Sequence, residues 1–105
     1  MTERVHIQDV KPFAVPARLS DLRGPRTGVL TLPRRVYWGP VAVVDIGTFG
    51  DTVKAYQATI REAGPADQTA ILNEDRLREV WSSLLLPSRV RSAWEQRFAE
   101  LESRP

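Results

Sequence analysis

Two helical patterns meet at a proline in the stretch NEDRLREVWSSLLLPSRVRSAWEQRFAELE, residues 73–102. The first pattern follows Asn73, a favourable N-cap, and its two opening acids suit the positive end of a helix dipole. The apolar stripes consist of Leu77, Val80, Trp81, Leu84 and Leu85 before the proline and of Val90, Trp94, Phe98 and Leu101 after it. Because Pro87 breaks the first pattern, the stretch predicts amphipathic helices over 74–85 and 88–102, with both tryptophans in the core.

Two more helices are predicted upstream, over 51–63 and 65–72. Asp51 is a good N-cap for the first, Gly64 suits its end, and Pro65 suits the start of the second. One face of the first helix is apolar and carries Val53, Tyr56, Ile60 and Ala63. The chain from residue 51 onward is therefore predicted to be mainly helical.

Nearer the N-terminus the apolar pattern becomes that of β-strands. The run GVLTL, residues 28–32, stops at a proline, and the run PVAVVDI, residues 40–46, stops at a glycine. These runs predict a short β-hairpin over 28–46. Its connection contains two arginines and two aromatic residues, Arg34, Arg35, Tyr37 and Trp38.

Residues 1–27 hold three prolines and few periodic apolar positions, so we expect an extended arm there. Residues 1–40 carry seven basic side chains against three acids, whereas 41–105 carry eight against ten. The front of the chain is therefore basic, although the net charge is only +2. The sequence as a whole predicts an α+β fold, mostly α: an extended basic arm, then one small domain over 28–105 with a short hairpin and three to four amphipathic helices.

The residue types that catalysis and metal binding need are nearly missing. There is no cysteine, and the one histidine, His6, lies in the expected arm. This argues against disulfides, thiolate nucleophiles and ordinary zinc sites. The GTFG segment at 47–50 lacks the lysine that follows the glycines of a P-loop. We expect no enzymatic activity, no cofactor and no metal.

The sequence predicts neither an exported protein nor a membrane protein. Residues 1–10 include Glu3 and Asp9 and lack the apolar run of a signal peptide. The longest apolar stretch, 40–44, is far shorter than the roughly 18 residues that span a bilayer. We therefore expect a cytoplasmic protein with no membrane partner.

Arginine, tyrosine and tryptophan dominate binding hot spots, since they combine a large contact area with a polar tip. The hairpin connection concentrates these types in Arg34, Arg35, Tyr37 and Trp38, and we predict that it contacts a partner. The alternative is that the two aromatic residues cap the small core while the arginines are solvated. The same residue types also suit single-stranded nucleic acid, through stacking and phosphate contacts.

Arg89 and Arg91 form a second predicted contact point. They fall in the first turn of the last predicted helix, where cations oppose the helix dipole, and a local conflict of this kind is typical of functional residues. The alternative is compensation by Glu95, four residues after Arg91, or by Glu79. A helix–turn–helix over 77–98 would bring both arginines first into a DNA groove, but its turn lacks the usual glycine.

Several short segments resemble, in order and spacing, a family of small actinobacterial proteins encoded beside nucleotidyltransferase-like toxins of the AbiEii/MenT kind. Together the segments span most of the chain, and each is short. They are LRGP at 22–25, LPRRVYW at 32–38, the helix at 56–63, ILN at 71–73, and LLLPSRVRSAWEQRF at 84–98.

Members of this family act as cognate antitoxins. The resemblance implies a stoichiometric inhibitor that covers the active site of a toxin that would otherwise add nucleotides to tRNA. A basic arm and an arginine–aromatic loop would suit an acidic, metal-binding catalytic pocket. Some such proteins are labelled transcriptional regulators, so the alternative is a nucleic-acid-binding regulator with operator DNA as its partner. Residue type alone selects the predicted partner-binding residues, Arg34, Arg35, Tyr37, Trp38, Arg89 and Arg91.

Overall fold

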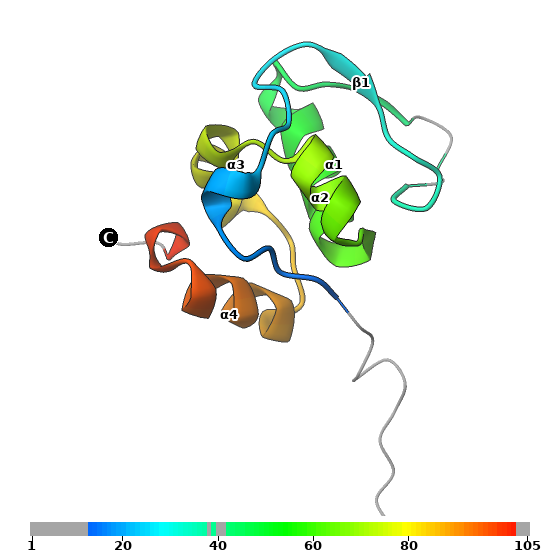
Figure 1. Ribbon diagram of the computed structural model, residues 1–105. Helices are drawn as coiled ribbons and strands as arrows, with labels where there is room; N and C mark the ends of the chain where they lie inside the picture. The colour runs from blue at the N-terminus through cyan, green and yellow to red at the C-terminus, as the bar shows by residue number, and fades with distance from the viewer. Residues whose placement is uncertain (1–12, 38, 40–41, 103–105) are drawn as a thin grey trace, which may run out of the picture.

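A computed structural model of the chain describes residues 13–37, 39 and 42–102 (Figure 1). In Figure 1, α1 (Phe49–Glu62) and α2 (Pro65–Ile71) lie between the hairpin and α4 (Ser88–Arg97). The described part is mostly helical, with one small antiparallel sheet, which confirms the predicted α+β class. The elements in chain order are the 3-10 helix η2 (Leu19–Asp21), β1 (Val29–Thr31), β2 (Val43–Asp45), α1 (Phe49–Glu62), α2 (Pro65–Ile71), α3 (Glu74–Val80), η3 (Trp81–Ser83), α4 (Ser88–Arg97) and η4 (Ala99–Leu101).

The hairpin pairs β1 with β2 in antiparallel register. Leu30 lies opposite Val44, and this pair packs toward the core, with Val44 fully buried. A hydrogen bond from Ile46 N to Gly28 O, 2.8 Å long, extends the pairing by one residue. Gly28 has a φ of 101°, a conformation that residues with a Cβ rarely adopt. The hairpin predicted over 28–46 is confirmed in its two strands.

Helix α1 begins at Phe49, two residues before the start expected from Asp51. Its N-cap is Thr48, whose hydroxyl accepts a hydrogen bond from Asp51 N at 3.4 Å. The Asp51 carboxylate instead accepts a hydrogen bond of 2.8 Å from the backbone N–H of Asp45, at the end of β2. Asp51 as the N-cap is therefore wrong. Threonine and aspartate are both favourable N-caps, so the sequence alone does not show whether Thr48 or Asp51, three residues apart, is the N-cap.

The starts of α2 and α3 are as predicted. Gly64 is the N-cap of α2, and Pro65 occupies its first turn, where a missing N–H costs nothing. Asn73 caps α3 by accepting a hydrogen bond of 3.1 Å from Arg76 N through its side-chain oxygen. Caps of this kind act within a few residues, so the sequence alone identifies them.

The helices predicted to reach residues 85 and 102 end earlier. Helix α3 ends at Val80 and is followed directly by the 3-10 helix η3. Leu84 then has an extended backbone conformation, ahead of Pro87. Helix α4 ends at Arg97, and the backbone leaves the helical region at Phe98 before η4. Residues three apart lie on the same side in a 3-10 turn and nearly so in an α-helix, so apolar spacing does not separate the two.

Aromatic rings form the core between α3 and α4. The ring centroids of Trp81 and Trp94 are 5.9 Å apart, and those of Trp94 and Phe98 are also 5.9 Å apart, in a tilted and an edge-on arrangement. Trp81 is 1% exposed and Trp94 is not exposed, which confirms both as core residues. Tyr56 and Ile60 of α1 are fully buried as well, so the core continues from α4 toward the hairpin.

Residues 13–27, the described part of the predicted arm, lie along the helical body. Leu19 and Leu22 are buried in the core. Gly24 N donates a hydrogen bond of 2.7 Å to Leu72 O, and a Cβ on Gly24 would lie only 2.1 Å from the carbonyl oxygen of Ile71. This part of the segment therefore belongs to the packed domain, whereas the first half of the predicted arm lies outside the described residues.

Candidate functional site

The hairpin connection is a compact turn whose apolar residues point inward. Leu32 and Val36 are buried, and the backbone N–H groups of Val36 and Tyr37 both donate to Pro33 O at 2.9 Å. Arg34 and Arg35, which lie between the buried residues, are exposed. The turn thus presents two cations on a firmly packed base. Trp38, the fourth residue predicted to bind a partner here, lies outside the described residues.

Arg35 forms a two-pronged ion pair with Asp67 in the first turn of α2. Its Nε donates to Asp67 Oδ2 at 2.6 Å, and its Nη2 donates to Oδ1 at 2.8 Å. The Arg35 side chain is 71% exposed, whereas that of Asp67 is 15% exposed. The hydrogen bond from Arg35 lowers the pKa of Asp67, and the same bond raises the pKa of Arg35. The pair fixes the direction of the guanidinium and fastens the loop to α2.

Tyr37 is half-buried beside α1. The ammonium of Lys54 lies 4.8 Å from the centroid of the Tyr37 ring, a cation–π contact. Gly39 lies against the other end of the ring, since a Cβ there would come within 2.4 Å of the Tyr37 hydroxyl oxygen. Tyr37 therefore partly fits the alternative that the aromatic residues of this loop cap the core.

The loop and α1 enclose a surface cleft of about 540 Å³. Its lining combines three cations and one acid with an apolar base, and the residues are Arg35, Val36, Tyr37, Gly39, Lys54, Gln57, Ala58, Arg61 and Glu62. Arg61 is exposed in the last turn of α1 and makes no ion pair among the described residues. The cleft is therefore a basic surface with an apolar base, suited to an anionic group.

An exposed leucine lies next to this cleft. The side-chain oxygen of Gln57, in the cleft wall, accepts a hydrogen bond of 2.9 Å from Leu85 N. This bond anchors the segment between η3 and α4 to α1. Leu85 is 74% exposed, the most exposed large apolar residue of the described chain. The apolar spacing predicts Leu85 on the buried face of a helix, but the chain is extended from Leu84, and this turns Leu85 outward.

Arg91, predicted to contact a partner, points into the protein. Its guanidinium lies 5.0 Å from the Trp81 ring centroid and donates hydrogen bonds to the carbonyl oxygens of Trp81 and Leu84. It also pairs with Glu95 at 3.6 Å, the compensation that the sequence offered as the alternative. Arg91 thus gives the carbonyls of Trp81 and Leu84, at the two ends of η3, a charged donor and joins η3 to α4.

Arg89 is exposed, and its guanidinium lies 5.1 Å from the centroid of the Phe13 ring. Figure 1 places α1 and α2 between the hairpin and α4, on which Arg89 lies. The fold therefore brings Arg34, Arg35 and Tyr37 together in one turn, whereas Arg89 and Arg91 lie on α4 and do not line the cleft.

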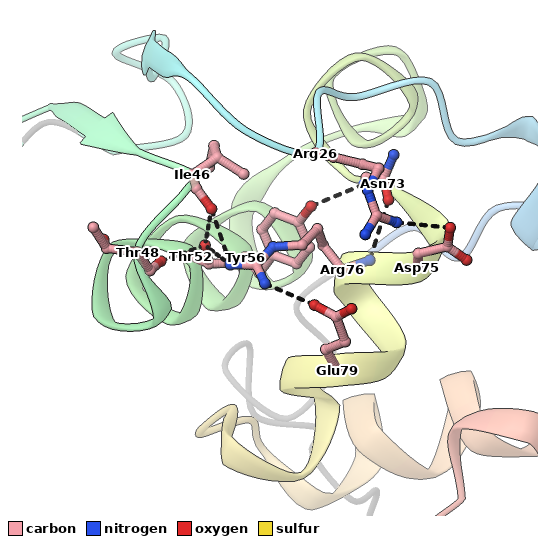
Figure 2. Close-up of polar contacts among 9 residues, drawn as sticks. All are labelled: Arg26, Ile46, Thr48, Thr52, Tyr56, Asn73, Asp75, Arg76 and Glu79. Atoms are coloured by element: carbon pink, nitrogen blue, oxygen red, sulfur yellow. Dashed lines mark hydrogen bonds and ion pairs between the residues drawn. The ribbon is translucent and has the colours of Figure 1, made fainter.

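A polar cluster that sequence reasoning missed joins β2, α1 and α3 (Figure 2). Arg76, with a side chain 16% exposed, donates to Ile46 O at 2.9 Å, to the Thr52 hydroxyl at 2.8 Å and to Glu79 at 2.7 Å. Beside it, the Tyr56 hydroxyl accepts a hydrogen bond from Asn73 N at 3.0 Å. Burial raises the pKa of Tyr56. The cluster holds the end of the hairpin on the helices, and no local pattern predicts it because its members come from three elements.

Among the described residues, no group of three or more histidine, cysteine, aspartate or glutamate side chains is placed to hold a metal ion. In the same part of the chain, no helix has the length and apolar character to cross a membrane. Comparisons of the chain with models of protein families, with curated proteins and with solved structures found no match.

Proposed function

We propose that the protein is a cytoplasmic antitoxin that binds a cognate nucleotidyltransferase-like toxin and blocks its active site. It does so by protein–protein contact and carries out no reaction of its own. The contact surface is the cleft between the hairpin connection and α1, together with Arg34 beside it. Operator DNA is a further candidate partner.

The observation that carries this proposal is the mixture of residues in the cleft. Two arginines and a tyrosine, residue types that supply much of the energy at protein interfaces, lie with a lysine and an apolar base in one small concave surface. Charge complementarity makes such a surface suited to acidic side chains of a partner. The short segments that resemble the antitoxin family include the connection itself, LPRRVYW at 32–38.

Co-expression of the protein with the proposed nucleotidyltransferase-like toxin tests the proposal. We expect the protein to restore growth of cells that make the toxin, and the two chains to purify together. The matched variants Arg61→Glu and Arg97→Glu are compared for growth rescue, since both arginines are exposed in the last turn of a helix, but only Arg61 lines the cleft. We expect Arg97→Glu to act as the wild type does and Arg61→Glu to neutralise the toxin less well. Growth arrest in the presence of the wild-type protein, without co-purification, would end the proposal.

The second candidate function is a nucleic-acid-binding transcriptional regulator. The same cations favour it, because they could also contact phosphates. Arg91 weighs against a helix–turn–helix mode, since its guanidinium is used inside the protein. Binding to operator DNA with an affinity that falls steeply as salt is raised would favour this function. Tight binding to the toxin without DNA binding would favour the first.

A further inference from the structure

We propose that the cleft binds an extended acidic segment of the partner, in which a bulky apolar side chain next to the carboxylates packs on Leu85. This inference rests on the proposed function and specifies the chemistry of the partner at the same site. It follows from three features: the charge of the cleft, the fixed orientation of Arg35, and the exposed leucine beside Gln57.

The charge of the cleft favours an anionic occupant. Its lining holds Arg35, Lys54 and Arg61 against the single acid Glu62, and Arg34 is exposed on the adjoining turn. Asp67, which pairs with Arg35 from outside the lining, offsets one of these positive charges, and the surface stays basic. Cations that converge on a concave surface attract and orient carboxylates more strongly than the same cations spread over a flat surface. A basic occupant would add repulsion, and a purely apolar occupant would desolvate cations without replacing their partners.

Arg35 is held ready for such a carboxylate. Asp67 takes the Nε and Nη2 donors of its guanidinium, which leaves Nη1 without a hydrogen bond to any described residue. Because two bonds fix the plane of the group, Nη1 is presented in one direction and loses little conformational entropy when a carboxylate binds. Asp67 is thus a positioning residue for Arg35, and Arg61 supplies a second cation that makes no ion pair among the described residues.

The size and the apolar part of the surface favour a short extended segment. A cleft of about 540 Å³ is in the range that accommodates a small ligand or a few side chains, not a folded domain. Val36 and Ala58 give it an apolar base, and Leu85 is held beside it by the hydrogen bond to Gln57. An exposed leucine next to cations matches a peptide that carries a bulky apolar residue between acidic residues.

The surface suits an acidic peptide better than a nucleic acid. Lys54 lies over the ring of Tyr37, so this face of the ring is already covered and does not offer a platform for a stacked base. Leu85 adds an apolar contact that phosphates and sugars do not use.

Fluorescence anisotropy of the full chain with short fluorescein-labelled probes tests the inference. The probes are the peptides Glu-Glu-Leu-Glu-Glu, Gln-Gln-Leu-Gln-Gln and Glu-Glu-Gly-Glu-Glu, and a five-nucleotide oligothymidylate. We expect the first peptide to bind most tightly. Arg61→Gln should weaken its binding about fivefold, the size of one lost charge contact, whereas Arg97→Gln should leave it unchanged. Leu85→Ser should weaken binding of the leucine peptide but not that of the glycine peptide.

Equal binding of the acidic and neutral peptides, or equal effects of Arg61→Gln and Arg97→Gln, would overturn the inference. So would oligothymidylate that binds as tightly as the acidic peptide, which would assign the cleft to nucleic acid. The two proposals fail separately. If Arg61→Glu no longer neutralises the toxin but the wild-type protein does not bind the acidic peptide, the acidic segment is rejected and the antitoxin proposal is kept. If the protein binds the acidic peptide specifically but does not neutralise the toxin, the antitoxin proposal is rejected and the acidic-peptide site is kept.

Discussion

Arg35 and Asp67 are 32 residues apart in the chain, and two hydrogen bonds, 2.6 and 2.8 Å long, join the guanidinium to the carboxylate. The pair is the side-chain link between the hairpin connection and α2. Because the Arg35 side chain is largely exposed, solvent screens the attraction, and the pair contributes orientation more than stability. The proposed contact surface depends on that orientation.

Substitution of Asp67 by asparagine should loosen the connection without unfolding the domain. We expect Asp67→Asn to leave the urea unfolding midpoint nearly unchanged, because solvent around the exposed Arg35 side chain screens the attraction and such a pair adds little stability. Amide hydrogen exchange at Val36 and Tyr37 should become faster, since the loop loses its attachment to α2. Unchanged exchange at these amides would contradict the role given to the pair.

The pKa of Asp67 should depend on Arg35. The hydrogen bond from Arg35 lowers this pKa, so the carboxylate stabilises the fold above its ordinary pKa, and this contribution is lost as the pH falls through the lowered folded-state pKa. NMR titration of the side-chain carboxyl carbon measures the value directly. In Arg35→Gln we expect the pKa to rise toward the ordinary aspartate value; a pKa equally low in the variant would show that another group lowers it.

Arg91 should matter for stability rather than for partner contact. Arg91→Met leaves the carbonyls of Trp81 and Leu84 without their charged donor, and we expect it to lower the free energy of unfolding by about 2 kcal/mol. Arg89→Met, at an exposed position in the same helical turn, should cost less than about 1 kcal/mol. Urea denaturation of both variants makes the comparison, and equal costs would refute the inward role of Arg91.

Two glycine substitutions test whether residues 13–27 are part of the domain. Gly24→Ala forces a Cβ against the carbonyl of Ile71 and should destabilise the fold by about 2 kcal/mol. Gly50 lies in a helix, and a Cβ added there would meet no atom of another part of the chain within 4 Å. Gly50→Ala should therefore leave the free energy of unfolding unchanged or raise it by up to about 1 kcal/mol. Thermal unfolding distinguishes them. If Gly24→Ala unfolds at the same temperature as the wild type, residues 13–27 do not pack on the helical domain in solution.

The apolar spacing of the chain predicts most of the fold, because each helix and strand must bury one face. It identifies the hairpin, the four helices and the two core tryptophans. It does not identify the ends of α3 and α4, where 3-10 turns replace the last α-helical turn, nor the burial of Leu19 and Leu22 in a segment without regular periodicity. Such features depend on contacts between distant segments.

Residue type predicts only part of the candidate site. Arg34, Arg35 and Tyr37 follow from their place in an exposed connection. Arg61 and Asp67 come from α1 and α2 and join the site only through folding, so no pattern near the connection indicates them. The dipole conflict at Arg91 predicts a partner contact, but the partners of this arginine in the structure are carbonyls inside the protein.

The most direct test of the account is the nucleotide-adding activity on tRNA of the purified nucleotidyltransferase-like toxin that we propose as the partner, measured as increasing amounts of the protein are added. The account predicts that activity falls in proportion to the protein added. It also predicts that Arg97→Glu acts as the wild type does, and that Arg61→Glu needs a large excess to give the same inhibition. Full toxin activity in the presence of excess wild-type protein would contradict the account.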